Sequence, residues 1–194
     1  IDYPDFNLRL ASVAKKNNIK VLYYVSPQVW EWRKGRVKKI AELVDRMAVI
    51  LPFEEEIYKK AGLDCEFVGH PVFDEMKERK TDKNVLKREL GLKEGVPLLS
   101  LLPGSRHHEL DRLLPVILNV VKAFKKEFAG FQFCVPLAPN TDIDKYNYII
   151  ESMRHEGVVI NKSESLKTLT ASDLAVVASG TAVFQAAMLG IPLV

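Results

Sequence analysis

Short apolar runs alternate with stretches of helical periodicity along the whole chain. The runs are rich in Val, Leu, Ile and Phe, which is typical of strands in a parallel sheet buried on both faces. Strands are predicted over residues 20–25, 48–51, 66–68, 97–102, 131–135, 158–160, 174–177 and 191–194. Between them, apolar residues recur with the spacing of one helix face. Helices are predicted over residues 6–16, 36–47, 53–61, 85–90, 109–128, 144–155, 163–170 and 181–189. The alternation predicts an α/β fold with parallel sheets and helices on both faces.

The most polar stretch of the sequence, residues 74–84, separates two such series of elements. We therefore predict a first domain over residues 1–71, a polar linker over 72–84 and a second domain over 85–194. The chain opens without an initiator Met and ends within the apolar run 191–194. We expect a fragment of a longer protein, with both sheets incomplete, because an α/β domain rarely ends there.

Composition and charge narrow the class of protein. Of the 194 residues, 47% are hydrophobic, which is ample for a core. The net charge of +3 is too small to argue for nucleic-acid binding. No apolar run approaches the ~18 residues of a membrane span. Cys65 and Cys134 lie far apart and form no metal or redox pattern, so we expect a reducing compartment and no metal site.

The clearest candidate for ligand binding is the turn after the apolar run 97–102. Pro103, Gly104, Ser105 and Arg106 break that run, and a helix follows. This layout places unpaired backbone N–H groups at a helix N-terminus, where a phosphate binds well. Gly104 permits close approach of the backbone to a ligand, and Ser105 adds a hydroxyl. Arg106 adds a planar guanidinium whose N–H groups match the oxygens of a phosphate. An ordinary strand–helix turn with a surface Arg remains an alternative.

A second turn repeats this pattern. Ser179, Gly180 and Thr181 follow the apolar run 174–177 and precede a helix. Parallel sheets bind ligands beyond the carboxyl ends of their strands, so both turns are expected at one edge of a sheet. Two helix N-termini at one edge favour a diphosphate or a nucleotide. The alternative is that small residues serve only close packing of strand against helix.

Two carboxylates flank Tyr3 and Pro4 at the start of the chain. Asp5 directly precedes the predicted helix 6–16, so its ordinary role is that of an N-cap. Asp2 has no such structural role. A carboxylate that faces a crevice can act as a general base, which makes Asp2 a candidate catalytic residue.

Two tryptophans, Trp30 and Trp32, adjoin a basic cluster that contains Arg33, Lys34 and Arg36. An anionic membrane attracts such a cluster by ~1 kcal/mol per basic residue, and tryptophan prefers the membrane interface. A solvated helix face with one buried Trp is an alternative interpretation. Nucleic acid is a third and poorly supported one, because the patch is short.

Six stretches together resemble the lipid-A-disaccharide synthase family. In the family's order and spacing they are residues 1–7 (IDYPDFN), 24–33 (YVSPQVWEWR), 51–54 (LPFE), 68–71 (VGHP), 102–106 (LPGSR) and 178–182 (ASGTA). The resemblance implies a GT-B glycosyltransferase with two Rossmann-like domains. It implies transfer of 2,3-diacylglucosamine from its UDP carrier onto 2,3-diacylglucosamine 1-phosphate, with release of UDP and without a cofactor or a required metal. It also implies a peripheral protein at the cytoplasmic face of the inner membrane of Gram-negative bacteria. Whether the protein forms a homodimer stays an open question.

The resemblance implies roles for individual residues. Asp2 matches the family's essential aspartate and is the expected general base on the acceptor 6-hydroxyl. Arg106, with the backbone of its turn, is expected to hold the diphosphate during catalysis. The expected substrate-binding residues are Asp5, Gly104, Ser105, Ser179, Gly180, Thr181 and Gln185. The expected lipid-facing residues are Trp30, Trp32, Arg33, Lys34 and Arg36.

Gln185 departs from the family pattern, in which a Glu at this position bonds the nucleotide ribose. An amide offers one oxygen acceptor, so weaker UDP binding is expected. Two alternatives stay open. One is another GT-B enzyme acting on a UDP-sugar, such as an epimerase or a peptidoglycan-type transferase, and the other is an inactive nucleotide-binding fragment. We expect the isolated chain to be inactive, because half of the cleft is absent.

Overall fold

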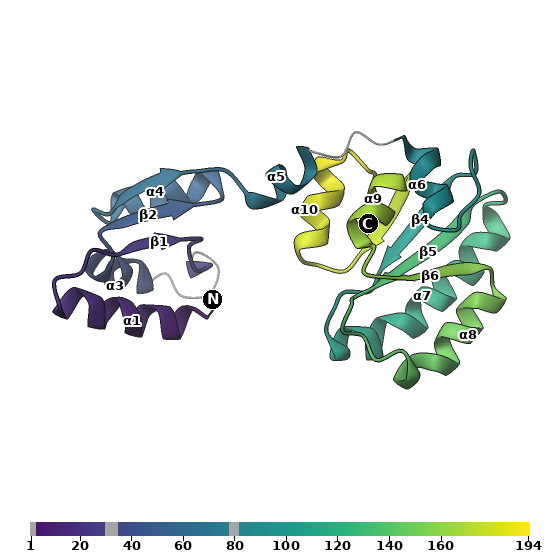
Figure 1. Cartoon of the computed structure of the whole chain (residues 1–194), viewed down its shortest axis with the longest axis horizontal. Coiled ribbons are helices and arrows are strands. Elements are labelled where there is room, and N and C mark those ends of the chain that lie inside the picture. The colour runs from purple at the N-terminus through teal and green to yellow at the C-terminus, as the bar shows by residue number, and fades with distance from the viewer. Residues whose placement is uncertain (1–2, 30–34, 78–81) are drawn as a thin grey trace. The chain divides into compact units, whose positions relative to one another are not determined.

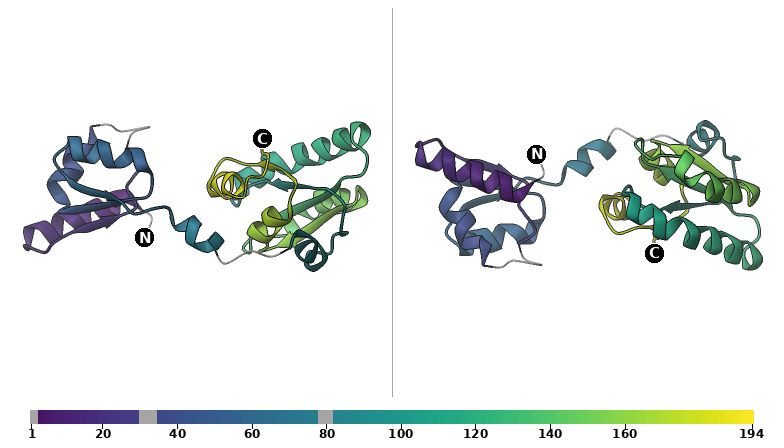
Figure 2. Two further views of the ribbon diagram at one scale, coloured as in Figure 1. Left: turned by 90° about the horizontal axis from the view of Figure 1, so that it is seen from above. Right: turned by 90° about the horizontal axis from the view of Figure 1, so that it is seen from below.

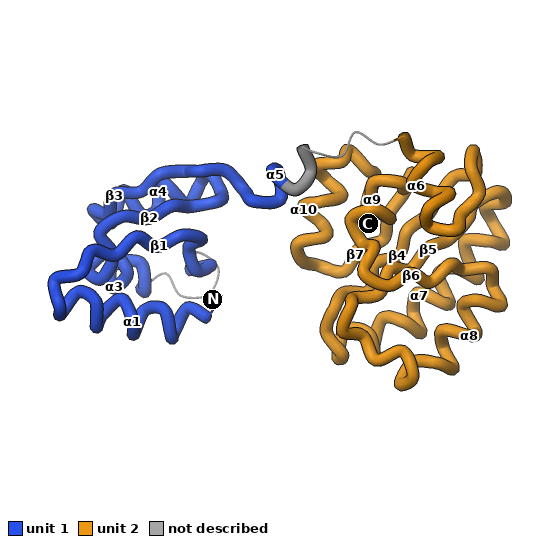
Figure 3. The backbone as a smooth tube through the Cα atoms, viewed as in Figure 1, with its two compact units in different colours: residues 1–78 blue, residues 79–194 orange. Residues whose placement is uncertain are grey.

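The computed structural model describes residues 3–29, 35–77 and 82–194 (Figure 1). The chain forms two compact units, residues 1–78 and 79–194 (Figure 3). The division falls within the predicted linker, but helices α5 (Pro71–Lys77) and α6 (Lys83–Glu89) extend into both ends of that segment. Because Glu, Lys and Arg are good helix formers, a polar composition alone did not distinguish a linker from exposed helices.

The first unit contains a three-stranded parallel sheet in the order β1-β2-β3. Its strands are β1 (Leu22–Tyr24), β2 (Arg46–Val49) and β3 (Asp64–Phe67), and its other helices are α1 (Pro4–Lys16), α3 (Arg36–Leu43) and α4 (Pro52–Lys60). One buried cluster, which includes Leu8, Ile40, Met47 and Tyr58, joins α1, α3, β2 and α4. Each strand predicted for this region is present, with shifted ends.

The second unit contains a four-stranded parallel sheet in the order β6-β5-β4-β7. Its strands are β4 (Leu98–Leu102), β5 (Gln132–Leu137), β6 (Val158–Lys162) and β7 (Leu174–Val177). The remaining helices are α7 (His107–Glu127), the 3-10 helix η1 (Asp144–Tyr146), α8 (Asn147–His155), α9 (Ser165–Ala171) and α10 (Thr181–Met188).

Helices cover both faces of this second sheet, and Figure 2 shows α6 and α7 on opposite sides of it. Leu99 and Leu101 of β4 pack with buried residues of α7 and α8. Leu98 packs with residues of α6 and α9, and Leu102 with residues of α9 and α10. All five residues of β4 are therefore buried, which explains why the strand reads as a continuous apolar run.

The predicted strand 191–194 runs beside β7 but forms only one parallel bridge, between Leu193 and Ala175. The N–H groups of Ala175 and Val177 donate to the carbonyls of Pro192 and Val194. Among the helices that the structure describes, none is long and apolar enough to cross a membrane.

Candidate functional site

A pocket of about 550 Å³ opens at the carboxyl edge of the second sheet. Its walls come from the loops that follow β4, β5, β6 and β7 and from the first turns of α7 and α10. Strand β4 lies between β5 and β7, so the chain leaves β4 toward one neighbour and returns on the other side. Such a switch point is where open parallel sheets bind their ligands. The volume suits a small molecule of nucleotide size.

The turn after β4 supplies one wall of this pocket. Gly104 has a φ of +89°, a conformation that favours glycine. The N–H groups of Ser105 and Arg106 donate to Oε2 of Glu109 over 3.0 and 3.1 Å. Nη1 of Arg106 lies 3.2 Å from Oε1 of the same carboxylate, while the Arg106 side chain is 73% exposed. Two backbone donors of this turn are therefore already paired within the chain.

Sequence reasoning missed Glu109, which it treated only as the start of a helix. Helix α7 begins at His107, so Glu109 occupies the third helical position, where a Glu side chain often pairs with the backbone before the helix. The N–H of Arg106 lowers the pKa of the Glu109 carboxyl; partial burial raises it, but the N–H of Ser105 and the Arg106 guanidinium lower it further. The carboxylate is thus held in its charged form in the lining of the pocket.

The turn after β7 supplies the facing wall, and its donors differ from those of the first turn. Ser179, Gly180 and Thr181 are exposed at the start of α10. Among the residues that the structure describes, no acceptor pairs with the N–H groups of Ser179, Gly180, Thr181 or Ala182. The first N–H groups of a helix have no partner in the helix itself, so they are available to an anion.

Gln185 lies one turn further along α10 and is half-buried in the same pocket. The pocket thus brings together every site residue predicted in the second unit: Gly104, Ser105, Arg106, Ser179, Gly180, Thr181 and Gln185. Their convergence is a tertiary property, because the two turns are separated along the chain by β5 and β6.

In the first unit, the interpretation of Asp5 as an N-cap is wrong. Pro4 starts α1, since its fixed φ suits the first helical position, and Tyr3 is the N-cap residue. Asp5 lies in the first turn, where Oδ1 is 2.9 Å from Nη2 of Arg36. The pair lines a cavity of about 350 Å³ with side chains that include Arg9 and Lys39. Arg36, expected to face lipid, therefore has a carboxylate partner on α1.

The other predicted site residues of the first unit, Asp2, Trp30, Trp32, Arg33 and Lys34, lie outside the described residues. Their roles stay predictions. In the parts of the chain that the structure does describe, no three His, Cys, Asp or Glu residues are grouped as a metal site would need.

A buried polar network at the carboxyl edge of the first sheet was not predicted. Glu54 is 1% exposed; its Oε1 accepts from Ser26 Oγ over 2.8 Å and its Oε2 accepts from the N–H of Leu51 over 2.9 Å. Tyr58 donates its hydroxyl to Ser26 Oγ over 3.2 Å, and burial raises the pKa of Tyr58 to about 12. Next to Ser26, Val25 has a φ of +65°, which is strained for a β-branched residue. The network holds a strained loop at the sheet edge.

Comparisons with known proteins decide the family. The sequence profile described as Lipid-A-disaccharide synthetase matches residues 1–194. The chain belongs to the lipid-A-disaccharide synthetase family. It is 48% identical to a lipid-A-disaccharide synthase of Syntrophus aciditrophicus and 44% identical to one of Myxococcus xanthus, in each case over the whole chain and 50% of the relative. The chain therefore spans about half the length of these relatives of its family.

Solved structures agree with the GT-B prediction. A putative UDP-N-acetylglucosamine 2-epimerase from Listeria monocytogenes aligns with 96% of this chain and 52% of its own, at a TM-score of 0.67 and 14% identity. A UDP-GlcNAc 2-epimerase from Neisseria meningitidis, solved with UDP-GlcNAc, aligns with 96% of this chain and 55% of its own, at a TM-score of 0.64 and 13% identity. At such low identity these likenesses show the fold alone. The predicted fold class, α/β of GT-B type with parallel sheets, is confirmed.

Proposed function

We propose that this chain is part of a glycosyltransferase that joins UDP-2,3-diacylglucosamine to 2,3-diacylglucosamine 1-phosphate and releases UDP. Membership of the lipid-A-disaccharide synthetase family over all 194 residues supports this reaction. The observation that carries the proposal is the convergence of the two small-residue turns in one pocket at the switch point of the second sheet. We assign that pocket to the UDP donor.

The donor's diphosphate is placed by the backbone N–H groups that start α10 and by the guanidinium of Arg106. As the glycosidic bond breaks, negative charge grows on the leaving UDP. Donors that are already oriented toward this charge stabilise the transition state more than the bound substrate. The loss of one such donor lowers the rate by about 10²–10³. In this proposal Arg106 is a catalytic residue, and Ser179, Gly180 and Thr181 bind substrate.

Gln185 takes the position toward the nucleotide ribose. Its amide has one oxygen acceptor for the two ribose hydroxyls, whereas a carboxylate has two. Gln185 in place of the family's Glu is compatible with UDP binding and predicts a weaker complex with UDP.

The remaining features rest on the family resemblance. Asp2 acts as general base on the acceptor 6-hydroxyl, and Asp5, three residues later in the first turn of α1, binds substrate. The segment that contains Trp30, Trp32 and Arg33 meets the inner-membrane surface from the cytoplasmic side. The reaction needs no cofactor, since the sugar arrives already activated by its diphosphate, and no nucleic acid takes part.

Titration calorimetry with UDP tests the assignment, with GDP as the specificity control. It is carried out on the 194-residue chain and on the complete protein that its gene encodes. Selective UDP binding, weakened at least about tenfold in Arg106→Ala, is expected because a hydrogen bond to a charged group is lost. Arg112→Ala is the matched control, since Arg112 is an exposed residue of α7 outside the pocket lining. A folded protein that does not bind UDP would refute the proposal, and turnover of the two lipid substrates by the complete protein completes the test.

A further inference from the structure

The two helix N-termini of the pocket are chemically different, although their sequences look alike. At α10 the described residues leave the first N–H groups without an acceptor. At α7 the carboxylate of Glu109 accepts from two successive N–H groups, at 3.0 and 3.1 Å. An anion that approaches the pocket therefore meets open donors on one side and an internal carboxylate on the other.

The turn after β4 is built closely around that carboxylate. A Cβ on Gly104 would overlap the carboxylate oxygen of Glu109 and come within 2.9 Å of its Cδ. The φ of +89° favours glycine at position 104, and any larger residue there would also push the Glu109 carboxylate out of its place. The second carboxylate oxygen pairs with the Arg106 guanidinium at 3.2 Å, so one side chain contacts the backbone turn and the cation together.

A phosphate that replaced Glu109 on these N–H groups would leave two anions side by side at the edge of the pocket. Two negative charges in contact with the same turn repel each other, and the repulsion is stronger than in bulk water because the site is partly desolvated. The side chain of Glu109 is only 20% exposed, and its carboxylate is held by two N–H groups and by the Arg106 guanidinium, so a phosphate would have to break all three contacts to displace it. The arrangement favours a phosphate at α10, with Glu109 left in place behind Arg106.

We propose that Glu109 is a positioning residue for the donor site: it closes the Gly104–Arg106 turn and holds the Arg106 guanidinium toward a diphosphate bound at α10. This inference rests on the proposed function. In this inference the Glu109 carboxylate occupies the N-terminus of α7, and the nucleotide diphosphate binds at the N-terminus of α10. Glu109 lines the pocket, but its carboxylate is engaged by the turn and by Arg106, so in this proposal it acts through Arg106 and not by contact with the substrate.

A double-mutant cycle on the complete protein tests this role. UDP dissociation constants are measured by calorimetry for Arg106→Ala, Glu109→Ala, Glu109→Gln and the double alanine variant. Glu109→Gln nearly preserves the volume and keeps an oxygen for the N–H groups but lacks the charge. Asp82→Ala is the matched control, because Asp82 caps α6 through the N–H groups of Asn84 and Val85 in the same unit, away from the pocket lining.

Glu109→Ala is expected to weaken UDP binding by about tenfold, since an Arg106 that is no longer held in place loses its charge-assisted hydrogen bond to the diphosphate. Glu109→Gln is expected to recover part of the loss, and the double variant to bind no more weakly than Arg106→Ala. Asp82→Ala is expected to lower the unfolding midpoint and to leave UDP binding unchanged. In turnover, Glu109→Ala is expected to lower kcat as well as raise the KM for the donor, because a misplaced Arg106 stabilises the transition state less.

Three results overturn the inference while the donor site stands. One is that Arg106→Ala weakens UDP binding while Glu109→Ala leaves it unchanged, which would show that the carboxylate only caps the helix. If Glu109→Ala instead strengthens UDP binding, the carboxylate competes with the ligand. If the losses in the two single variants add in the double variant, Glu109 does not act through Arg106. If the wild-type protein does not bind UDP, the proposed function fails, and this inference fails with it.

Discussion

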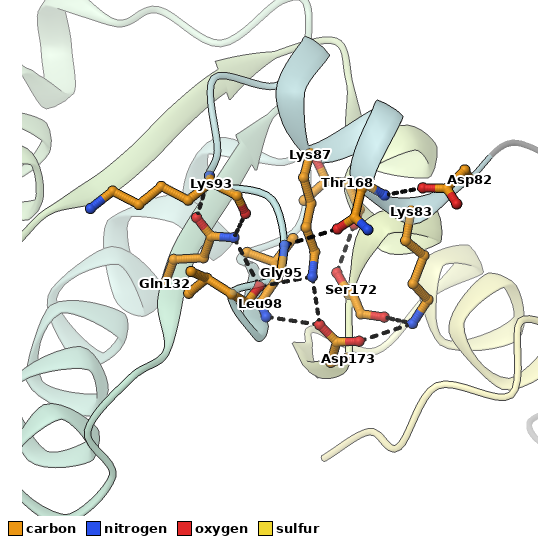
Figure 4. A network of polar contacts seen from close by, with 12 residues as sticks. Asp82, Lys83, Lys87, Lys93, Gly95, Leu98, Gln132, Thr168, Ser172 and Asp173 are labelled. Atoms are coloured by element: carbon orange, nitrogen blue, oxygen red, sulfur yellow. Dashed lines mark hydrogen bonds and ion pairs between the residues drawn. The ribbon is translucent and has the colours of Figure 1, made fainter.

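Replacement of Asp173 by Asn is expected to destabilise the second unit strongly. Figure 4 shows Asp173 at the amino end of β7, facing two lysines of α6. Oδ2 of Asp173 accepts from Lys87 Nζ over 2.9 Å and from the N–H of Leu98 over 3.0 Å. Oδ1 accepts from Lys83 Nζ over 3.1 Å. The carboxylate thus joins α6, the start of β4 and the start of β7.

The size of the effect follows from the burial of Lys87, whose side chain is 6% exposed. The Asn variant leaves this buried ammonium without its counter-charge, with only the Val96 carbonyl at 2.8 Å and a neutral amide oxygen as acceptors. The Asp173 side chain is 37% exposed, so solvent screens part of the interaction. Loss of this half-buried ion pair is expected to cost about 2 kcal/mol in the free energy of unfolding, less than the ~3–5 kcal/mol of a fully buried pair. Lys83, by contrast, is 50% exposed, so Lys83→Gln is a matched control expected to cost less than about 1 kcal/mol.

The assay is denaturant unfolding of the 194-residue chain, followed by far-UV circular dichroism and by hydrogen exchange at β4 and β7. Fluorescence is unsuitable, because both tryptophans, Trp30 and Trp32, belong to the first unit. UDP binding is expected to stay unchanged, since the pocket lies at the opposite edge of the sheet. An Asn variant no less stable than Lys83→Gln would refute the reasoning.

The same variant predicts a pH dependence. Partial burial raises the pKa of Asp173, but the N–H of Leu98 and the two ammonium groups lower it more, so the net pKa lies below its ordinary value. A carboxyl with a lowered folded-state pKa adds stability above its unfolded pKa of about 4 and loses it as the pH falls through the folded value. The stability difference between wild type and Asp173→Asn should therefore shrink in acid below about pH 4. A constant difference down to acid unfolding would show that the charge is not responsible.

Three further predictions concern single residues of the second unit. Gly104→Ala should lower stability by about 1–2 kcal/mol through its left-handed backbone alone and should also weaken UDP binding, because its Cβ displaces the Glu109 carboxylate. Gln185→Glu should tighten UDP binding about fivefold, because hydrogen bonds to a charged acceptor are stronger than those to an amide. Ser100→Ala should raise the free energy of unfolding by about 1 kcal/mol, because the buried Oγ has no hydrogen-bond partner among the described residues.

Each of these has a control or an opposing outcome. Gly95→Ala shares the left-handed backbone, with a φ of +70°, but its Cβ would meet nothing within 4 Å. It should match Gly104→Ala in backbone strain and leave the UDP dissociation constant unchanged. An unchanged dissociation constant in Gln185→Glu rules out the ribose assignment. A loss of stability in Ser100→Ala would show that the hydroxyl is paired in solution.

The sequence alone determined the α/β class and the two candidate turns. The apolar run of β4 and the turn at Gly104 are local signals: strand burial and backbone flexibility follow from the residues themselves and their immediate neighbours. The Glu109 carboxylate was also within reach of local reasoning, since it lies three residues after the helix N-cap, but the helix was predicted to begin too late.

The tertiary structure alone decided which residues meet. The strand order β6-β5-β4-β7 brings the turn after β4 beside the turn after β7, and local periodicity does not encode strand order. The pairing of Lys87 with Asp173 and the burial of Glu54 against Ser26 likewise join residues far apart in sequence. A charged residue is predicted to be exposed unless its partner is known, and the fold supplies that partner.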